Sequence, residues 1–281
     1  MGPLWYGALA APQPIPMSVL RRFLVHTSRT LDRASRALLY AAAGTLTLSH
    51  LKADIRDSWS TFFDREADIA SGFMTWETDV VSRCVRSSDR VLVVGSGTGR
   101  DLLAFSALGC TVTGIEPSPA AAHSRRVLEQ RHLTVPVVDG FFEDVTLEGP
   151  FDVIVFSWFC YGYIPVSRRR IGVLEKAIAL LAPGGRILVS CVVNPVPPYS
   201  RLIGLQRALA KVTGSNWLME NGDQLRLART GETVFTFEHI FVPGEFEREA
   251  ASAGLSVMCT NREEMMFALQ PAFTRAAATA S

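Results

Sequence analysis

The residues best placed to do chemistry are three alternating glycines, Gly95, Gly97 and Gly99, and an acidic residue, Glu116, further along the chain. Glycine lets the backbone turn tightly and approach a ligand closely, because it has no side chain in the way. A carboxylate at the end of the next strand can accept hydrogen bonds from both hydroxyls of a ribose. This combination predicts a site for a cofactor that contains a nucleoside.

Apolar runs place these residues at the ends of two neighbouring strands. Residues 91–94 are apolar and lead directly into the glycines, and residues 112–115 lead directly into Glu116. Strands that are apolar throughout are typical of a parallel sheet covered on both faces. Apolar residues resume at helical spacing after the glycines, so the N–H groups of a helix point at whatever occupies the loop.

The order of the glycines separates this loop from a nicotinamide-cofactor loop. The nicotinamide pattern is G-x-G-x-x-G, but here Arg100 occupies the last position and the glycines read G-x-G-x-G. In this form the loop resembles the first motif of class I S-adenosylmethionine-dependent methyltransferases, and residues 89–194 follow the family's order well. The resemblance implies a doubly wound, mostly parallel seven-stranded sheet with helices on both faces. The alternative is a Rossmann-like unit that binds another nucleotide, or none.

The resemblance also implies a cofactor, S-adenosyl-L-methionine, and the residues that bind it. Glu116 would meet the ribose, Asp139 the adenine amino group, and Phe141 the adenine ring. The family more often has the acid directly before the aromatic residue, whereas Gly140 intervenes here, and a solvated acidic turn is the alternative. The expected cofactor-binding residues are Gly95, Ser96, Gly97, Thr98, Gly99, Asp101, Glu116, Pro117, Asp139, Gly140, Phe141, Ser157 and Trp158.

The methyl acceptor is expected beyond a fourth strand at residues 151–157, because ligands of open parallel sheets lie beyond the carboxyl ends of the strands. Trp158, Tyr161 and Tyr163 follow this strand and could wall a flat substrate or hold a sulfonium by a cation–π contact. Core packing is the alternative for these rings. A general base is needed only if the nucleophile arrives protonated. His239 is the first candidate, with Tyr161 and Tyr163 next, and a structural, hydrogen-bonded histidine is the alternative.

The rest of the chain predicts additions to a methyltransferase domain at residues 89–281. Residues 51–88 interleave aromatic and charged residues and predict two lid helices, with plain core packing as the alternative. Residues from about 194 to 242 predict an insertion after the fifth strand that caps the substrate. This insertion should contain one helix and a hairpin whose turn is at residues 221–223.

Residues 1–50 predict a basic amphipathic segment, with five arginines and one acidic residue. Over residues 17–41, leucines recur on one face of a helix and arginines on the opposite face. Such a helix can lie on an anionic membrane surface. Packing of the leucines on the domain or on a second subunit is the alternative. The proline-rich residues 1–16 predict disorder.

The function predicted from these features is methylation of a small molecule by S-adenosylmethionine, with the acceptor atom (O, N or S) left open. A net charge of +1 argues against a nucleic-acid partner. The five scattered cysteines have no C-x-x-C spacing, so no metal site is expected, and reduced thiols favour the cytoplasm. The alternative function is non-catalytic binding of S-adenosylmethionine by a regulatory or scaffold protein. The oligomeric state stays open.

Overall fold

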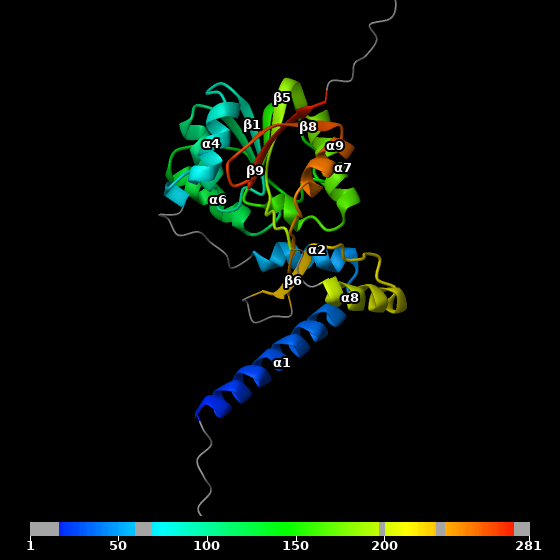
Figure 1. The fold of residues 1–281 in the computed structure, drawn as a ribbon. Helices are drawn as coiled ribbons and strands as arrows, with labels where there is room; N and C mark the ends of the chain where they lie inside the picture. The colour runs from blue at the N-terminus through cyan, green and yellow to red at the C-terminus, as the bar shows by residue number, and fades with distance from the viewer. Residues whose placement is uncertain (1–16, 60–68, 197–199, 229–233, 273–281) are drawn as a thin grey trace, which may run out of the picture.

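The computed structural model describes residues 17–59, 69–196, 200–228 and 234–272, so the proline-rich residues 1–16 lie outside the described part (Figure 1). The first elements are α1 (Met17–Ala43), α2 (Leu48–Ser58), α4 (Thr75–Cys84), β1 (Arg90–Val94), α5 (Arg100–Ala107), β2 (Thr111–Glu116), α6 (Ala120–Gln130), β3 (Val137–Asp139) and β4 (Phe151–Phe156). They are followed by the 3₁₀ turn η1 (Cys160–Tyr163), α7 (Ser167–Ala179), β5 (Leu181–Ser190), α8 (Ser200–Thr213), β6 (Asp223–Leu227), β7 (Phe235–His239), α9 (Glu245–Ser252), β8 (Leu255–Thr260) and β9 (Met266–Pro271).

A seven-stranded sheet in the order β3-β2-β1-β4-β5-β9-β8 forms the centre of the larger part of the molecule (Figure 1). Strands β1 to β5 pair in parallel, and β9 pairs antiparallel with both β5 and β8. The prediction of a doubly wound, mostly parallel sheet is confirmed. The strand order reverses between β1 and β4, and a crevice for ligands opens at such a switch point.

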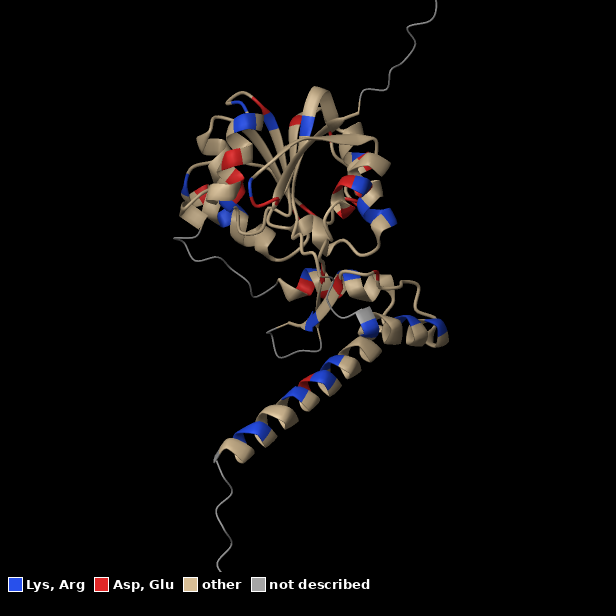
Figure 2. Ribbon diagram, in the orientation of Figure 1, with Lys and Arg blue, Asp and Glu red and all other residues tan. Residues whose placement is uncertain are grey.

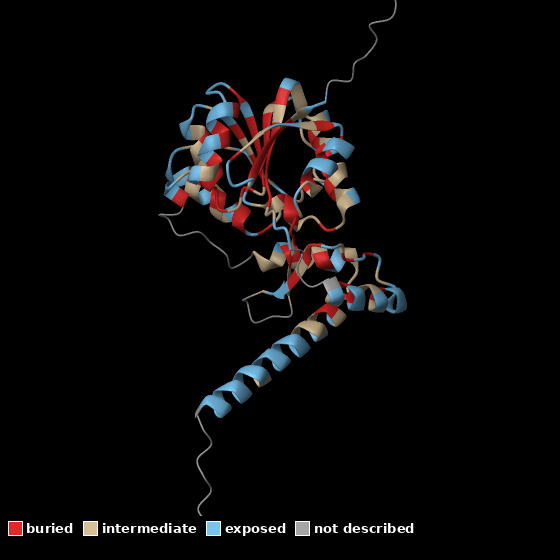
Figure 3. Ribbon diagram, in the orientation of Figure 1, coloured by how far each residue is buried: buried red, intermediate tan, exposed pale blue. Residues whose placement is uncertain are grey.

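Helices cover both faces of this sheet, which explains why its strands are apolar throughout. Along β1, Val91 and Val93 pack on the side of α4 and α5, whereas Leu92 and Val94 pack on the side of α7 and α9. Successive side chains of a strand point to opposite faces, so both sets are buried. Figure 3 shows the strands as the buried layer between the helices.

A smaller unit is assembled from the two regions added to the domain. The end of α1, helices α2 and α8 and the β6–β7 hairpin share a core of their own, which includes Tyr40, Leu51, Trp217 and Phe237. Hydrogen bonds tie the regions together, for example from the Trp217 indole N–H to the Leu46 carbonyl at 3.1 Å. The insertion therefore completes its core with residues from the start of the chain.

The predicted hairpin exists, but the predicted position of its turn is wrong. Strand β6 starts at Asp223 and pairs antiparallel with β7 from Asp223 opposite His239 to Leu227 opposite Phe235. The connection therefore follows Leu227 instead of preceding Asp223. The glycine turn at residues 221–222 leads into β6, and the Glu220 backbone N–H donates to the Asp223 carboxylate at 2.6 Å.

Candidate functional site

A cavity of about 380 Å³ opens at the carboxyl edge of the parallel strands. This volume suits a small ligand, since such sites are typically of a few hundred Å³. The expected cofactor-binding residues that line it are Gly95, Ser96, Gly97, Thr98, Asp101, Glu116, Pro117, Gly140, Phe141, Ser157 and Trp158. Of the expected set, Gly99 and Asp139 do not line the cavity.

The strand register explains how residues far apart in sequence meet here. Val94 at the end of β1 lies opposite Ile115 of β2 on one side and Phe156 of β4 on the other. The residues that follow these three positions therefore emerge at the same edge of the sheet. They are the glycine loop, Glu116 and Ser157.

The glycine loop faces the cavity at Gly97. Gly97 has a φ of +54°, and a Cβ added there would have no heavy atom within 4 Å. At Gly95, by contrast, an added Cβ would lie 2.8 Å from the Cys160 Cβ. Gly95 is therefore required by packing on η1, whereas Gly97 leaves an open cradle in which a ligand can touch the backbone.

The Glu116 carboxylate is held in place by backbone N–H groups of two loops. One of its carboxylate oxygens accepts from the Gly97 N–H at 2.8 Å, and the other accepts from the Ser118 N–H at 2.9 Å. A carboxylate oxygen has two lone pairs, so each keeps an acceptor position for a ligand hydroxyl. Loop and carboxylate thus fit the ribose end of S-adenosyl-L-methionine.

A buried charge cluster, missed by the sequence analysis, lies at the end of the cavity formed by α4 and α5. The Arg100 guanidinium contacts the carboxylates of Glu77 and Asp101, both at 2.6 Å, and stands 4.8 Å from the Trp158 ring centroid. Asp101 also accepts from the Ser157 hydroxyl. Asp101 also lines the cavity, so its carboxylate can meet the ammonium of the cofactor's amino-acid end.

Glu77 should make stability depend on pH. Burial, together with repulsion from Asp101, raises its pKa from 4.5 to about 7. The folded protein therefore binds more protons than the unfolded chain between these values, and Glu77 stabilises the fold as the pH falls from about 7 to 4.5. We expect the melting temperature of the native protein relative to Glu77→Gln to rise as the pH is lowered through this window. The exposed Glu129→Gln is the control, and a constant difference between native protein and Glu77→Gln would contradict the assignment.

The outer half of the cavity is aromatic and apolar. The Trp59 and Tyr163 rings line the cavity and lie 5.3 Å apart between centroids. Trp158 and Phe159, directly after β4, have φ values of +44° and +63°. Two such residues in the left-handed region cost conformational energy, and strain of this kind clusters at functional sites. Trp59, from the predicted lid region, is therefore placed beside the tyrosine that the sequence singled out.

Asp139 lies outside the cavity, contrary to its predicted contact with adenine. Its carboxylate pairs with Arg125 of α6 at 2.5 Å and its side chain is 68% exposed. The chain turns immediately afterwards, at Gly140, so that Phe141 and Glu143 enter the cavity instead. The solvated acidic turn describes Asp139 better than the adenine contact does.

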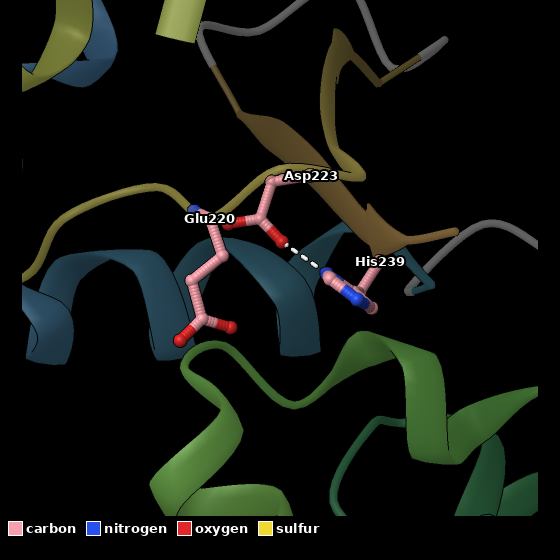
Figure 4. A group of neighbouring side chains, drawn as sticks. All are labelled: Glu220, Asp223 and His239. Atoms are coloured by element: carbon pink, nitrogen blue, oxygen red, sulfur yellow. Dashed lines mark hydrogen bonds and ion pairs between the residues drawn. The ribbon is translucent and has the colours of Figure 1, made fainter. Parts of the chain in front are cut away.

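His239 is placed away from the cavity, and both of its ring nitrogens already face carboxylates. Nδ1 lies 2.6 Å from Asp223 (Figure 4). Nε2 lies 3.2 Å from Glu245. Burial by itself would lower the pKa of His239, but the hydrogen bonds to the two carboxylates have the larger effect and raise the pKa. Both ring nitrogens are thus engaged within the protein, which favours the alternative of a structural, hydrogen-bonded histidine. His239 is not among the residues that line the cavity.

Tyr161 belongs to a buried network of charged and polar side chains near His239, whereas Tyr163 does not. The Tyr161 hydroxyl donates to Glu249 at 2.9 Å, and Glu249 in turn pairs with Arg170 at 2.7 Å. Tyr161 is absent from the cavity wall, and Tyr163 is part of it. Of the three predicted catalytic residues, the structure places Tyr163 at the cavity.

Glu220 and Asp223, the acids near His239 that could hold a metal, both have partners already. The ligand atoms of Glu220, Asp223 and His239 lie within 4.8 Å of one another, which would suit a metal ion (Figure 4). However, Glu220 accepts from the Arg170 guanidinium at 3.0 Å and from the Ser167 hydroxyl at 2.7 Å, while Asp223 is bound to His239. Each of these acids thus already has a partner in Arg170, Ser167 or His239, so we assign the cluster to charge pairing.

Comparison with known proteins finds methyltransferases among the proteins to which this chain is similar. Residues 92–187 match the family model described as a methyltransferase domain. The cypemycin N-terminal methyltransferase of a Streptomyces species is 28% identical over 123 residues, or 43% of this chain and 48% of that protein. The match thus spans about half the length of this curated relative.

Solved structures share the fold over most of the chain. The CcbJ methyltransferase from Streptomyces caelestis superposes with a TM-score of 0.53 at 18% identity, covering 78% of this chain and 96% of its own. CalS10, an amino pentose methyltransferase from Micromonospora echinaspora solved with S-adenosylmethionine, gives 0.50 at 19% identity, covering 75% and 98%. At these identities the likeness shows the fold.

Proposed function

We propose, on the premise that this chain is a class I S-adenosylmethionine-dependent methyltransferase, that it methylates a small molecule held in the outer half of the cavity. The observation that carries the proposal is a single cavity with two chemically different ends. One end combines the Gly97 cradle with the Glu116 carboxylate, and the other is lined by the paired rings of Trp59 and Tyr163.

The polar end suits the cofactor. S-adenosyl-L-methionine, when bound, supplies a methyl group activated by its sulfonium. Glu116 would accept the ribose hydroxyls, and the Gly97 backbone would lie against the cofactor. The Asp101 carboxylate beside Arg100 would meet the cofactor's ammonium. Phe141, whose ring also faces the Lys52 ammonium at 4.3 Å, would cover the adenine in place of a contact from Asp139.

The apolar end suits a compact acceptor and excludes water from it. Trp59 and Tyr163 offer flat, largely apolar surfaces, and small-molecule sites are lined mainly by side chains of this kind. Positioning matters most in this chemistry, because transfer of an activated methyl group depends chiefly on a nucleophile held in line with it.

A neutral amine is the acceptor atom that this cavity suits best. The described lining contains no histidine, and His239 is committed to the buried network. An amine can reach the site already deprotonated through solvent, so it requires no base from the protein. The relative named as an N-terminal methyltransferase points the same way.

The proposal is tested by incubating the protein with methyl-labelled cofactor and matched amine, hydroxyl and thiol acceptors of similar size and shape. We expect label in the amine products. Label in the hydroxyl or thiol products alone would contradict the choice of nitrogen. Tight cofactor binding, with no transfer to any acceptor or to a metabolite extract, would favour the non-catalytic alternative.

Tyr163 and Tyr161 should respond differently to mutation, although they are two residues apart. Tyr163→Ala removes part of the acceptor wall, so we expect turnover to fall about tenfold or more, while cofactor affinity stays within about twofold. Tyr161→Phe removes the hydrogen bond to Glu249, so we expect it to lower the free energy of unfolding by about 1–3 kcal/mol and to leave turnover near the native value. Calorimetry, thermal melts and initial rates check both variants. Full turnover in Tyr163→Ala would place the acceptor elsewhere.

A further inference from the structure

Helix α1 has an apolar face that the described part of the chain leaves uncovered. Leu24, Leu31 and Leu38 are 56%, 65% and 72% exposed, and Phe23 is 64% exposed. Figure 3 shows α1 exposed along most of its length. The predicted alternative that these leucines pack on the domain is therefore not what the described residues show.

The opposite face of α1 is basic. With about 3.6 residues per turn, Arg22, Arg29 and Arg33 fall together on the side away from the leucines. The helix contains five arginines and one acidic residue, Asp32, which pairs with Arg36 at 3.0 Å. Figure 2 shows the basic residues following one another along the helix.

Helix α8, which lies beside the end of α1, also displays basic and apolar side chains at its surface. It packs against α1, contains no acidic residue, and displays the basic side chains Arg201 and Lys211 at its surface. Val212 is 84% exposed and Leu205 is 37% exposed. The surface formed by α1 and α8, here called the α1–α8 surface, thus combines protruding apolar side chains with an excess of positive charge.

The fold holds α1 by one end and leaves the remainder accessible. Tyr40 and Ala43, near its C-terminal end, are buried in the core of the smaller unit. Its earlier turns extend away from the rest of the molecule (Figure 1). The apolar face can therefore contact a partner without any unfolding of the domain.

We propose that the α1–α8 surface docks on an anionic phospholipid membrane, with the apolar face of α1 inserted at the headgroup boundary. Helices of this kind bind membranes through buried apolar area together with attraction to anionic lipids. No helix in the described part of the chain is long and apolar enough to cross a bilayer, which fits a helix that lies on the surface.

Charge favours the lipid over a second copy of the chain. The helix carries five arginines and one acidic residue, and most of the arginines lie away from the leucines, so a second copy paired through the leucines would leave this positive charge without acidic partners. An anionic bilayer instead offers phosphates that the arginines can meet, each contributing favourably near the surface. The proposal is independent of methyl transfer and of the acceptor.

The test is sedimentation of the full chain with vesicles of phosphatidylcholine alone or mixed with phosphatidylglycerol. We expect binding to the mixed vesicles that weakens at high salt, and little binding to the neutral ones. Leu24→Glu with Leu31→Glu, and Arg29→Gln with Arg33→Gln, should each lower the partition coefficient by about tenfold or more. The exposed pair Arg126→Gln with Arg262→Gln makes the same charge change on the domain and should bind like the native protein.

Three results would overturn the proposal. One is absence of binding to the mixed vesicles. Another is an equal loss of binding in the Arg126→Gln, Arg262→Gln control, which would mean that overall charge is responsible. The third is a dimer in sedimentation equilibrium that Leu24→Glu with Leu31→Glu dissociates, without vesicle binding by the native chain, which would assign the face to a second copy.

Discussion

Replacing Gly97 by asparagine is expected to lower the affinity for S-adenosylmethionine by at least about 100-fold, or about 2.7 kcal/mol. Gly97 is the loop residue whose missing side chain leaves open space toward the cavity, at a φ of +54°. Asparagine tolerates this conformation better than most residues, so its main effect is to fill the cradle. Calorimetric titration with the cofactor and with its demethylated product measures the loss.

Gly184→Asn is the matched control for the backbone conformation. Gly184 has a φ of +78°, also with no heavy atom within 4 Å of an added Cβ, but it lies in the turn within β5 and not at the cavity. We expect both variants to melt within a few degrees of each other and only Gly97→Asn to lose binding. Normal binding by Gly97→Asn would mean that the loop is not the cofactor site.

Replacing Arg170 by methionine is expected to lower the free energy of unfolding by about 3–5 kcal/mol, because a buried charge pair loses one partner. The Arg170 side chain is fully buried and contacts Glu249 at 2.7 Å and Glu220 at 3.0 Å. Without it, these carboxylates and the Asp223–His239 pair would share a poorly neutralised site. Urea unfolding of native and variant protein gives the difference.

Two further variants distinguish the network from a general effect of the substitution. Arg168→Met changes an exposed residue of the same helix and should cost less than about 0.5 kcal/mol. Glu249→Gln combined with Arg170→Met removes one stranded charge and should recover part of the stability. Equal losses for Arg168→Met and Arg170→Met would show that the network contributes little.

The network around Arg170 also supports the position of Tyr163 at the cavity. Tyr161 is tied to Arg170 through Glu249, and Tyr163 follows at the other end of the same short turn, η1. Gly162, between them, packs so that an added Cβ would lie 3.0 Å from the His239 carbonyl oxygen. The buried charge pair of Arg170 and Glu249, together with the packing of Gly162 on His239, thereby holds the turn that presents Tyr163 to the cavity.

The sequence by itself determined the features whose causes are local. Apolar runs ending in Gly95 and Glu116 specify strand ends, and strand ends in a parallel sheet meet at one edge, so the loop and the acid could be placed together in advance. Most of the expected cofactor set lies along that edge for the same reason. The charge pattern of α1 was likewise readable from helical periodicity.

Only the tertiary structure decided which way side chains point and which partners they find. Asp139 stands at a strand end as expected, yet it turns to Arg125 and solvent. His239 and Tyr161 carry suitable chemistry, but Asp223, Glu245 and Glu249, which lie 6 to 88 residues away along the chain, are already hydrogen-bonded to them. Glu77 lies 23 residues from Arg100 and shows no local signal of their pairing. Periodicity fixes the face on which a residue lies, whereas burial and charge pairing depend on segments brought together by folding.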